Sequence, residues 1–263
     1  MKSAFKSFFV VTISVFICLV FGWNYLRHYG YSKTLQYPPP HPFLTEAPPK
    51  PWVIAYQGDL SKGPKNSLVA LDAAAALGPE VILWIDLMPT LQGEIWLNSN
   101  SDDGSQIQLG ELLERYPTRK MILNIQNYTP GLDKTLAVII NQKRAGNRIL
   151  IQSDEDGLLR DLREQNPAWL FGTSQAQVTL LKMLSSLGLE SLTPFKGDVY
   201  ITPSHFRNTL LINNPMINEV HRRKMNFIAG PVNKKEEVLD LIDRGVDGIM
   251  TTDPSLVLQL LSK

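Results

Sequence analysis

Polar and aromatic residues stand near the ends of three short apolar runs in the sequence. They are Tyr56, Gln57, Trp84, Asp86, Asn124 and Gln126. Trp84 and Asp86 are two positions apart, so in a strand both side chains point to the same face. An aromatic ring beside amides and one carboxyl group could stack on a sugar ring and bind its hydroxyls without net charge. The alternative is that these side chains only fill a barrel mouth.

Several other chemistries are excluded by composition and by the motifs that the sequence lacks. The formal net charge is +1, and charged residues make up 19% of the chain, which does not favour a nucleic-acid partner. The single cysteine, Cys18, lies in the apolar N-terminal run, so no thiol remains for a disulfide, a zinc site or a nucleophile. The sequence has no dinucleotide-binding glycine fingerprint, Walker loop or nucleophile elbow.

The sequence also offers few groups for metal binding or proton transfer. Asp86 alone is a poor metal site, because divalent cations take several oxygen ligands. The four histidines, His28, His41, His205 and His221, do not end the first or second expected strand. We therefore expect them at the surface or next to the membrane.

Apolar runs rich in β-branched residues alternate with amphipathic stretches from Trp52 onward, which predicts βαβ units and a parallel sheet. Strands are expected at 52–57, 80–87, 120–126, 147–152, 168–172, 197–202, 226–230 and 247–251. Helices are expected near 65–77, 107–116, 132–145, 156–165, 174–187, 215–224, 234–244 and 254–262. Asn214 before Pro215 and Asp253 before Pro254 are expected N-caps. Eight such units predict an α/β fold, a (β/α)8 TIM barrel with its chemistry at the carboxyl ends of the strands. An open doubly wound sheet is the alternative.

The N-terminal segment predicts a membrane anchor. Lys2 and Lys6 precede an uncharged stretch of about 20 residues, Ser7 to Leu26, which can span a bilayer as one helix. Trp23 and Tyr25 stand where aromatic rings favour the headgroup level, and Arg27 and Lys33 follow. We expect residues 1–33 to be an uncleaved single-pass signal anchor with a cytoplasmic tip. The folded domain is then expected on the exported side of the membrane.

Proline dominates the segment that follows the anchor. Residues 34–51 contain seven prolines, at positions 38, 39, 40, 42, 48, 49 and 51. Proline disfavours helix interiors and central strands, so we expect an extended linker that holds the domain away from the bilayer. The barrel is expected to occupy residues 52–263.

Short strings along residues 52–263 resemble the glycerophosphodiester phosphodiesterases, a family of barrel enzymes. The family's first strand ends in His-Arg-Gly, followed by Pro-Glu-Asn-Ser/Thr, and its second and third strands carry Glu-x-Asp and Glu-x-Lys. The matching strings here are Tyr56-Gln57-Gly58, Pro64-Lys65-Asn66-Ser67, Trp84-Ile85-Asp86, Ser99-Asn100 for a downstream His-Asp, Asn124-Ile125-Gln126, Gly230-Pro231-Val232-Asn233 and the closing run from Gly245 to Thr251.

The resemblance also implies that most functional positions have been replaced. The two family histidines correspond to Tyr56 and Ser99, which leaves no catalytic residue in these roles. The metal-binding carboxylates correspond to Trp84 and Asn124, with only Asp86 kept, and the phosphate-binding arginine and lysine correspond to Gln57 and Gln126.

These replacements favour a pseudoenzyme that binds an unknown ligand or protein partner without hydrolysis and without a cofactor. One alternative is an active phosphoric diester hydrolase of lipid metabolism, acting on glycerophosphodiesters or lipid headgroups with Ca²⁺ or Mg²⁺. A second is a glycan-binding or purely structural barrel. For the pseudoenzyme, the ligand-binding candidates are Tyr56, Gln57, Trp84, Asp86, Asn124 and Gln126, with Asp86 a metal ligand only if a cation binds.

Overall fold

The computed structural model describes residues 2–32, 35, 37–99, 107–206, 209–210 and 212–262. Within these residues a parallel barrel is built from β1 (Trp52–Tyr56), β2 (Val81–Pro89), β4 (Met121–Ile125), β5 (Ile149–Ser153), β6 (Leu170–Phe171), β7 (Val199–Pro203), β10 (Asn226–Gly230) and β11 (Gly248–Thr251). The hydrogen-bonded order is β6-β5-β4-β2-β1-β11-β10-β7. A single parallel bridge between Gly172 and Val199 brings the two end strands together. The predicted barrel is confirmed. The seam between β6 and β7 is its least strongly paired part, because one isolated bridge joins the two strands.

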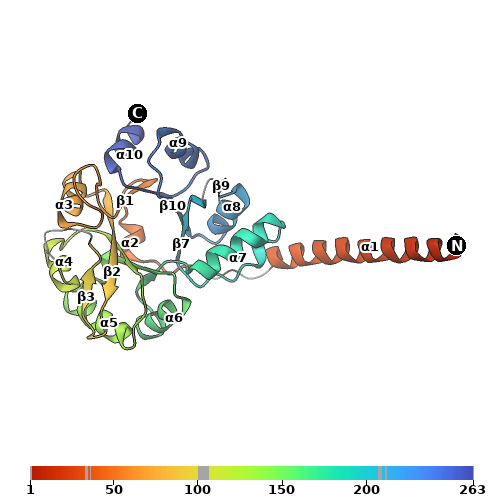
Figure 1. The fold of residues 1–263 in the computed structure, drawn as a ribbon, viewed down its shortest axis with the longest axis horizontal. Coiled ribbons are helices and arrows are strands. Elements are labelled where there is room, and N and C mark those ends of the chain that lie inside the picture. Colours follow the sequence, from red (N-terminus) through yellow and green to blue (C-terminus); the bar gives the residue numbers. More distant parts are fainter. Residues whose placement is uncertain are drawn as a thin grey trace.

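Helices surround the strands as a ring (Figure 1). They are α3 (Leu68–Ala76), α4 (Leu109–Arg115), α5 (Leu132–Gln142), α6 (Asp156–Gln165), α7 (Gln175–Ser186), α8 (Asn214–Arg222), α9 (Lys235–Asp243) and α10 (Pro254–Leu261). Each lies within a stretch expected to be helical or within one residue of it. The cap of α8 differs from the expectation, because Asn213, not Asn214, accepts the hydrogen bond from the Met216 amide. Asp253 caps α10 as expected.

Two short antiparallel additions were not expected from the sequence. β3 (Ile95–Leu97) pairs with the end of β2, after a turn in which Gly93 has a φ of +84°. β8 (His205–Phe206) and β9 (Thr209–Leu210) form a separate hairpin after β7. Both additions lie beyond the carboxyl ends of barrel strands, so they extend the mouth of the barrel.

The strands alternate their side chains between the barrel interior and the helices. One buried cluster, which includes Ile54, Ile82, Ile122 and Leu150, fills the interior. Two others, around residues such as Leu83 and Phe227, pack between the strands and the helix ring. Since Ile82 belongs to the interior, Trp84 and Asp86 on the same strand face the interior as well.

The proline-rich segment is not an extended linker throughout. Residues Pro42–Thr45 form a short helix, α2, with a proline in its first turn, where the missing N–H costs least. Phe43 is fully buried in the interior cluster and meets the Trp52 ring edge-on, with centroids 6.3 Å apart. The Lys120 ammonium donates to the Phe43 carbonyl at 2.8 Å. α2 therefore closes the end of the barrel opposite the mouth, and the expectation of an extended conformation is wrong for this part.

The N-terminal helix α1 (Lys2–Ser32) contains a stretch, Phe8–Ser32, that is long and apolar enough to cross a membrane. None of that stretch is buried against the rest of the protein at its most apolar window. Figure 1 shows α1 leaving the barrel sideways, next to α7. The last turns of α1 contact the barrel, so the proline-rich segment does not hold the barrel at a distance from the helix.

Candidate functional site

The carboxyl ends of β1, β2, β4 and β5 carry polar side chains at neighbouring positions. Asp86 is the register partner of Asn124, and Asn124 is the partner of Gln152. Tyr56 is the partner of Trp84, one step deeper in the barrel. Because the strands are parallel and in register, these side chains meet at one end of the barrel interior.

Asp86 is the centre of this group and is only 2% exposed. Its Oδ1 accepts hydrogen bonds from Trp84 Nε1 at 2.8 Å and from Asn124 Nδ2 at 2.9 Å. Its Oδ2 accepts from Gln57 Nε2 at 2.5 Å and from Gln126 Nε2 at 3.0 Å. Both oxygens therefore act as double acceptors, which is the full capacity of a carboxylate. Five of the six sequence-predicted ligand-binding residues are brought together here.

The backbone of Asp86 is held by a residue whose structural role the sequence did not reveal. Asn66 Oδ1 accepts from the Asp86 amide at 3.0 Å, and Asn66 Nδ2 donates to the Asp86 carbonyl at 2.7 Å and to the Asn98 carbonyl at 2.9 Å. Asn98 Nδ2 in turn donates to Gln126 Oε1 at 2.6 Å. Asn66 has a φ of +57°, a backbone region that asparagine tolerates better than most residues. These bonds fix the end of β2 and the orientation of the Gln126 amide.

Tyr56 and Trp84 form the aromatic part of the site. Their rings lie 5.3 Å apart, centroid to centroid, at an angle of 43°. Trp84 is only 5% exposed, so its face is not an open platform for a sugar ring. The Tyr56 hydroxyl has no hydrogen-bond partner among the described residues and is the aromatic polar group left for a ligand.

A cavity of about 170 Å³ opens beside these two rings. It is lined by Tyr56, Trp84, Asn124, Gln152, Asp154, Thr173, Gln175, Val178, Ile201, Thr202, Pro203, Gly230, Pro231 and Met250. None of these lining residues is positively charged, whereas Asp154 is acidic. The cavity therefore favours a small neutral or cationic polar group over an anion.

Burial sets the protonation of the two titrating groups in this cavity. It raises the pKa of Tyr56 to about 12, with a further contribution from the negative charges of Asp86 and Asp154. Burial also raises the pKa of Asp154, with help from Glu155. Tyr56 therefore stays protonated near neutral pH, where its hydroxyl can donate a hydrogen bond but cannot accept a proton as a general base.

Other sequence-predicted positions lie elsewhere. Ser99 follows β3 and does not line the cavity; its amide donates to the Leu97 carbonyl at 2.9 Å. Asn233, a strand-end position, accepts from Thr251 Oγ1 at 3.0 Å and from the Thr252 amide at 2.9 Å, which ties β10 to β11. Asn233, which matches a position in one of the family strings, therefore has a structural role in this protein. Residue 100 lies outside the described residues.

The histidines are also away from the cavity. His221 Nε2 lies 2.8 Å from Asp247 Oδ2, and His205 Nδ1 lies 3.1 Å from Ser204 Oγ. His41 is buried beside α2 and accepts from the Phe43 amide at 3.1 Å through Nδ1. The expected surface position is therefore wrong for His41, because the proline-rich segment folds onto the barrel.

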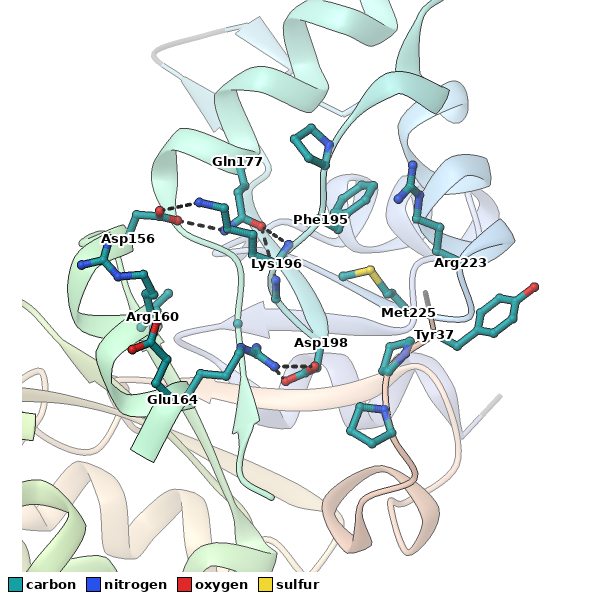
Figure 2. A pocket seen from close by; sticks show the side chains of 17 residues that line it. Tyr37, Asp156, Arg160, Glu164, Gln177, Phe195, Lys196, Asp198, Arg223 and Met225 are labelled. Carbon is teal, nitrogen blue, oxygen red and sulfur yellow. Dashed lines mark hydrogen bonds and ion pairs between the residues drawn. The ribbon is translucent and has the colours of Figure 1, made fainter. Parts of the chain in front are cut away.

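A larger cavity, about 620 Å³, lies outside the β6–β7 seam between α6 and α7 (Figure 2). Two pairs of its charged side chains bind one another: Lys196 Nζ lies 2.9 Å from Asp156 Oδ2, and Arg163 binds both oxygens of Asp198. Arg223 on its wall binds Glu219. These pairs neutralise part of the lining charge, and the cavity also presents Arg160, Glu164 and the apolar ring of Phe195.

Three proteins similar to this chain are described as phosphodiesterases. A glycerophosphodiester phosphodiesterase of Caldanaerobacter subterraneus subsp. tengcongensis is 23% identical over 252 residues, which cover 81% of this chain and 99% of the relative. No protein-family model matches the chain. A Silicibacter pomeroyi structure assigned as a glycerophosphoryl diester phosphodiesterase superposes with a TM-score of 0.68 at 16% identity, over 85% of this chain and 98% of that one.

A phosphodiesterase of Oleispira antarctica, solved with its product sn-glycerol-3-phosphate, superposes with a TM-score of 0.62 at 14% identity, over 84% of this chain and 99% of that one. The similarity therefore spans the barrel of each protein. The order of strands, the position of the site at their carboxyl ends and these comparisons show that the chain has the barrel fold of the glycerophosphodiester phosphodiesterases.

Proposed function

We propose that this protein is a membrane-anchored pseudoenzyme that binds a ligand or a protein partner at the barrel mouth without hydrolysing a phosphodiester. The observation that carries the proposal is the set of four N–H donors on Asp86. A carboxylate whose two oxygens are both occupied in this way has no free lone pair for another task.

The donor set around Asp86 does not fit a divalent cation. Ca²⁺ takes six to eight oxygen ligands and Mg²⁺ takes six, and either ion needs free carboxylate lone pairs at the site. The described residues contain no cluster of three or more histidine, cysteine, aspartate or glutamate side chains. Binding a cation at Asp86 would also displace amide and indole donors that the rest of the mouth holds in place. The Asp86 site therefore does not support a metal-assisted reaction.

The mouth is also poorly equipped for a phosphodiester. Hydrolysis needs a group that moves protons and a positive charge that stabilises the phosphoryl oxygens. The cavity supplies a phenol with a pKa raised to about 12, an acidic side chain and neutral amides. A small neutral ligand with hydroxyl groups fits this chemistry better, with the Tyr56 hydroxyl as donor and Asp154 as acceptor.

The second candidate is an active phosphoric diester hydrolase, favoured by the names of the similar proteins. An assay of the full chain in lipid nanodiscs separates the two. Glycerophosphocholine is supplied with Ca²⁺ or Mg²⁺, and released choline is measured for the wild type and for Asp86→Ala. We expect no turnover above the buffer rate in either protein. Wild-type turnover in the ordinary enzyme range of about 1 to 10³ per second, lost in Asp86→Ala, would refute the pseudoenzyme proposal.

Anchoring through α1 belongs to the same proposal. Its support is the apolar stretch Phe8–Ser32, exposed along its most apolar window. We propose that the barrel lies on the exported side, with Lys2 and Lys6 at the cytoplasmic end. Protease treatment of intact cells or sealed vesicles of defined orientation tests this topology: the barrel is expected to be degraded from the exported side only.

A further inference from the structure

The last turns of α1 pack against one corner of the barrel. Trp23 Nε1 donates to the Leu187 carbonyl at 2.8 Å, and the Tyr31 hydroxyl donates to Glu190 Oε1 at 2.8 Å. Trp23 and Tyr31 are eight positions apart, about 80° around the helix axis, so they contact the barrel from adjoining faces of α1. Gly30 lies between them and is buried; a β-carbon there would stand 2.2 Å from Ser191 Oγ. The barrel therefore packs directly against α1, and the small size of Gly30 allows the two to come close together.

These contacts set the height of the barrel relative to the apolar part of α1. The uncharged stretch ends at Leu26, and Arg27 follows it. Trp23 lies one turn before Arg27, at the level where indole rings favour the membrane interface. Because the Leu187 carbonyl accepts a hydrogen bond from Trp23, the end of α7 lies at this same level.

Apolar side chains are exposed at that end of α7. Met183 is 61% exposed and Leu187 is 60% exposed. They are four positions apart, so they share one face of the helix end. Large apolar side chains at both positions form an exposed patch, and the Leu187 carbonyl, which Trp23 binds, places this patch beside α1.

We propose that the C-terminal turn of α7, through Met183 and Leu187, inserts into the headgroup region of the bilayer beside Trp23. The inference rests on the proposed anchoring by α1 and adds a second membrane contact to it. Because the patch lies beside the apolar helix α1, the lipid surface is the partner that covers it. The barrel then touches the membrane directly and has a fixed orientation toward it.

Cysteine labelling of the full chain in nanodiscs tests the contact. A polarity-sensitive fluorophore is attached at position 187 in Cys18→Ser/Leu187→Cys, and its quenching by lipids with a spin label near the headgroup is measured. The substitution leaves the Leu187 backbone carbonyl, which Trp23 binds, in place. The matched control is Cys18→Ser/Val138→Cys, because Val138 on α5 is an apolar side chain with 53% exposure. We expect quenching and a blue shift at 187 and neither at 138.

The unmodified chain, labelled on its native Cys18, separates the two proposals. Quenching of the Cys18 probe by spin labels deep in the bilayer is expected if α1 spans the membrane. Quenching at Cys18 without quenching at 187 overturns the α7 contact and leaves the anchor standing. An unquenched Cys18 probe overturns both, and equal quenching at 187 and 138 overturns the α7 contact.

Discussion

The indole nitrogen of Trp84 donates a 2.8 Å hydrogen bond to Oδ1 of Asp86, two residues further along the same strand. In the family resemblance, position 84 corresponds to a metal-binding carboxylate, which would repel Asp86 without a cation between them. The tryptophan supplies an N–H donor in its place. Neutral N–H donors thus stabilise the Asp86 carboxylate.

The first prediction concerns this network. Asp86→Ala leaves four buried or half-buried N–H donors without their acceptor, so we expect the free energy of unfolding to fall by about 3 kcal/mol. Chemical denaturation of the full chain in detergent measures the change. Asp161→Ala is the control, because among the residues that the structure describes Asp161 forms an ion pair with the exposed Arg160 alone, and its loss should cost less than about 1 kcal/mol. Equal stability of Asp86→Ala and wild type would show that the network does not stabilise the mouth.

The second prediction concerns the closed end of the barrel. Phe43→Ala removes a fully buried ring from the interior cluster, and we expect a loss of about 3 to 5 kcal/mol in the free energy of unfolding. Tyr37→Ala, in the same proline-rich segment but exposed, should change stability little. Thermal melts of both variants provide the test. A Phe43→Ala melt that matches Tyr37→Ala would contradict the position of α2.

The third prediction is a pH dependence from His41. Burial lowers its pKa below the ordinary value of 6.5, so the unfolded chain binds a proton at a higher pH than the folded chain does. Stability is therefore complete above about pH 6.5 and falls as the pH drops toward the folded pKa, by at most about 1.4 kcal/mol per pH unit. His41→Asn keeps a side-chain cap for α2 and should show a flatter profile in this window. Parallel stability profiles of the wild type and His41→Asn would show that His41 does not cause the pH dependence.

A fourth prediction concerns the seat of the barrel on α1. Gly30→Val places side-chain atoms where Ser191 stands, so we expect α1 to separate from the barrel while the barrel stays folded. Gly22→Val is a close control, because a β-carbon at Gly22 meets nothing within 4 Å. Spin labels on Cys18 and on Val138→Cys report the distance between helix and barrel. The distance distribution should broaden in Gly30→Val only, and an unchanged distribution would contradict the contact.

The barrel was predictable because each strand and helix leaves a local pattern in the sequence. Asn124 and Asp86 were expected together because they end strands that parallel pairing brings side by side. Their hydrogen bonds were not predictable, since the same residues could have faced a ligand or a cation. Asn66 stands in one of the strings that resemble the family, but that match does not reveal that its side chain holds both Asp86 and Asn98.

The fold of the proline-rich segment, residues 34–51, could not be predicted from its composition. Proline content predicts an extended backbone, but Pro42–Thr45 is helical, and Phe43 contacts a residue far along the chain, Lys120. Composition carries no information on such long-range contacts. The buried state of a single phenylalanine in an otherwise polar and proline-rich stretch is therefore visible only in the folded chain.

The sideways departure of α1 from the ring of helices decides what the mouth can meet (Figure 1). With α1 upright in a bilayer and α7 resting on the headgroups, the open end of the strands looks along the membrane and not down into it. A lipid that stays in its leaflet passes beneath the barrel wall. A ligand would then reach Tyr56 from the side, parallel to the membrane plane. It would be either a dissolved molecule or a neighbouring protein anchored in the same membrane.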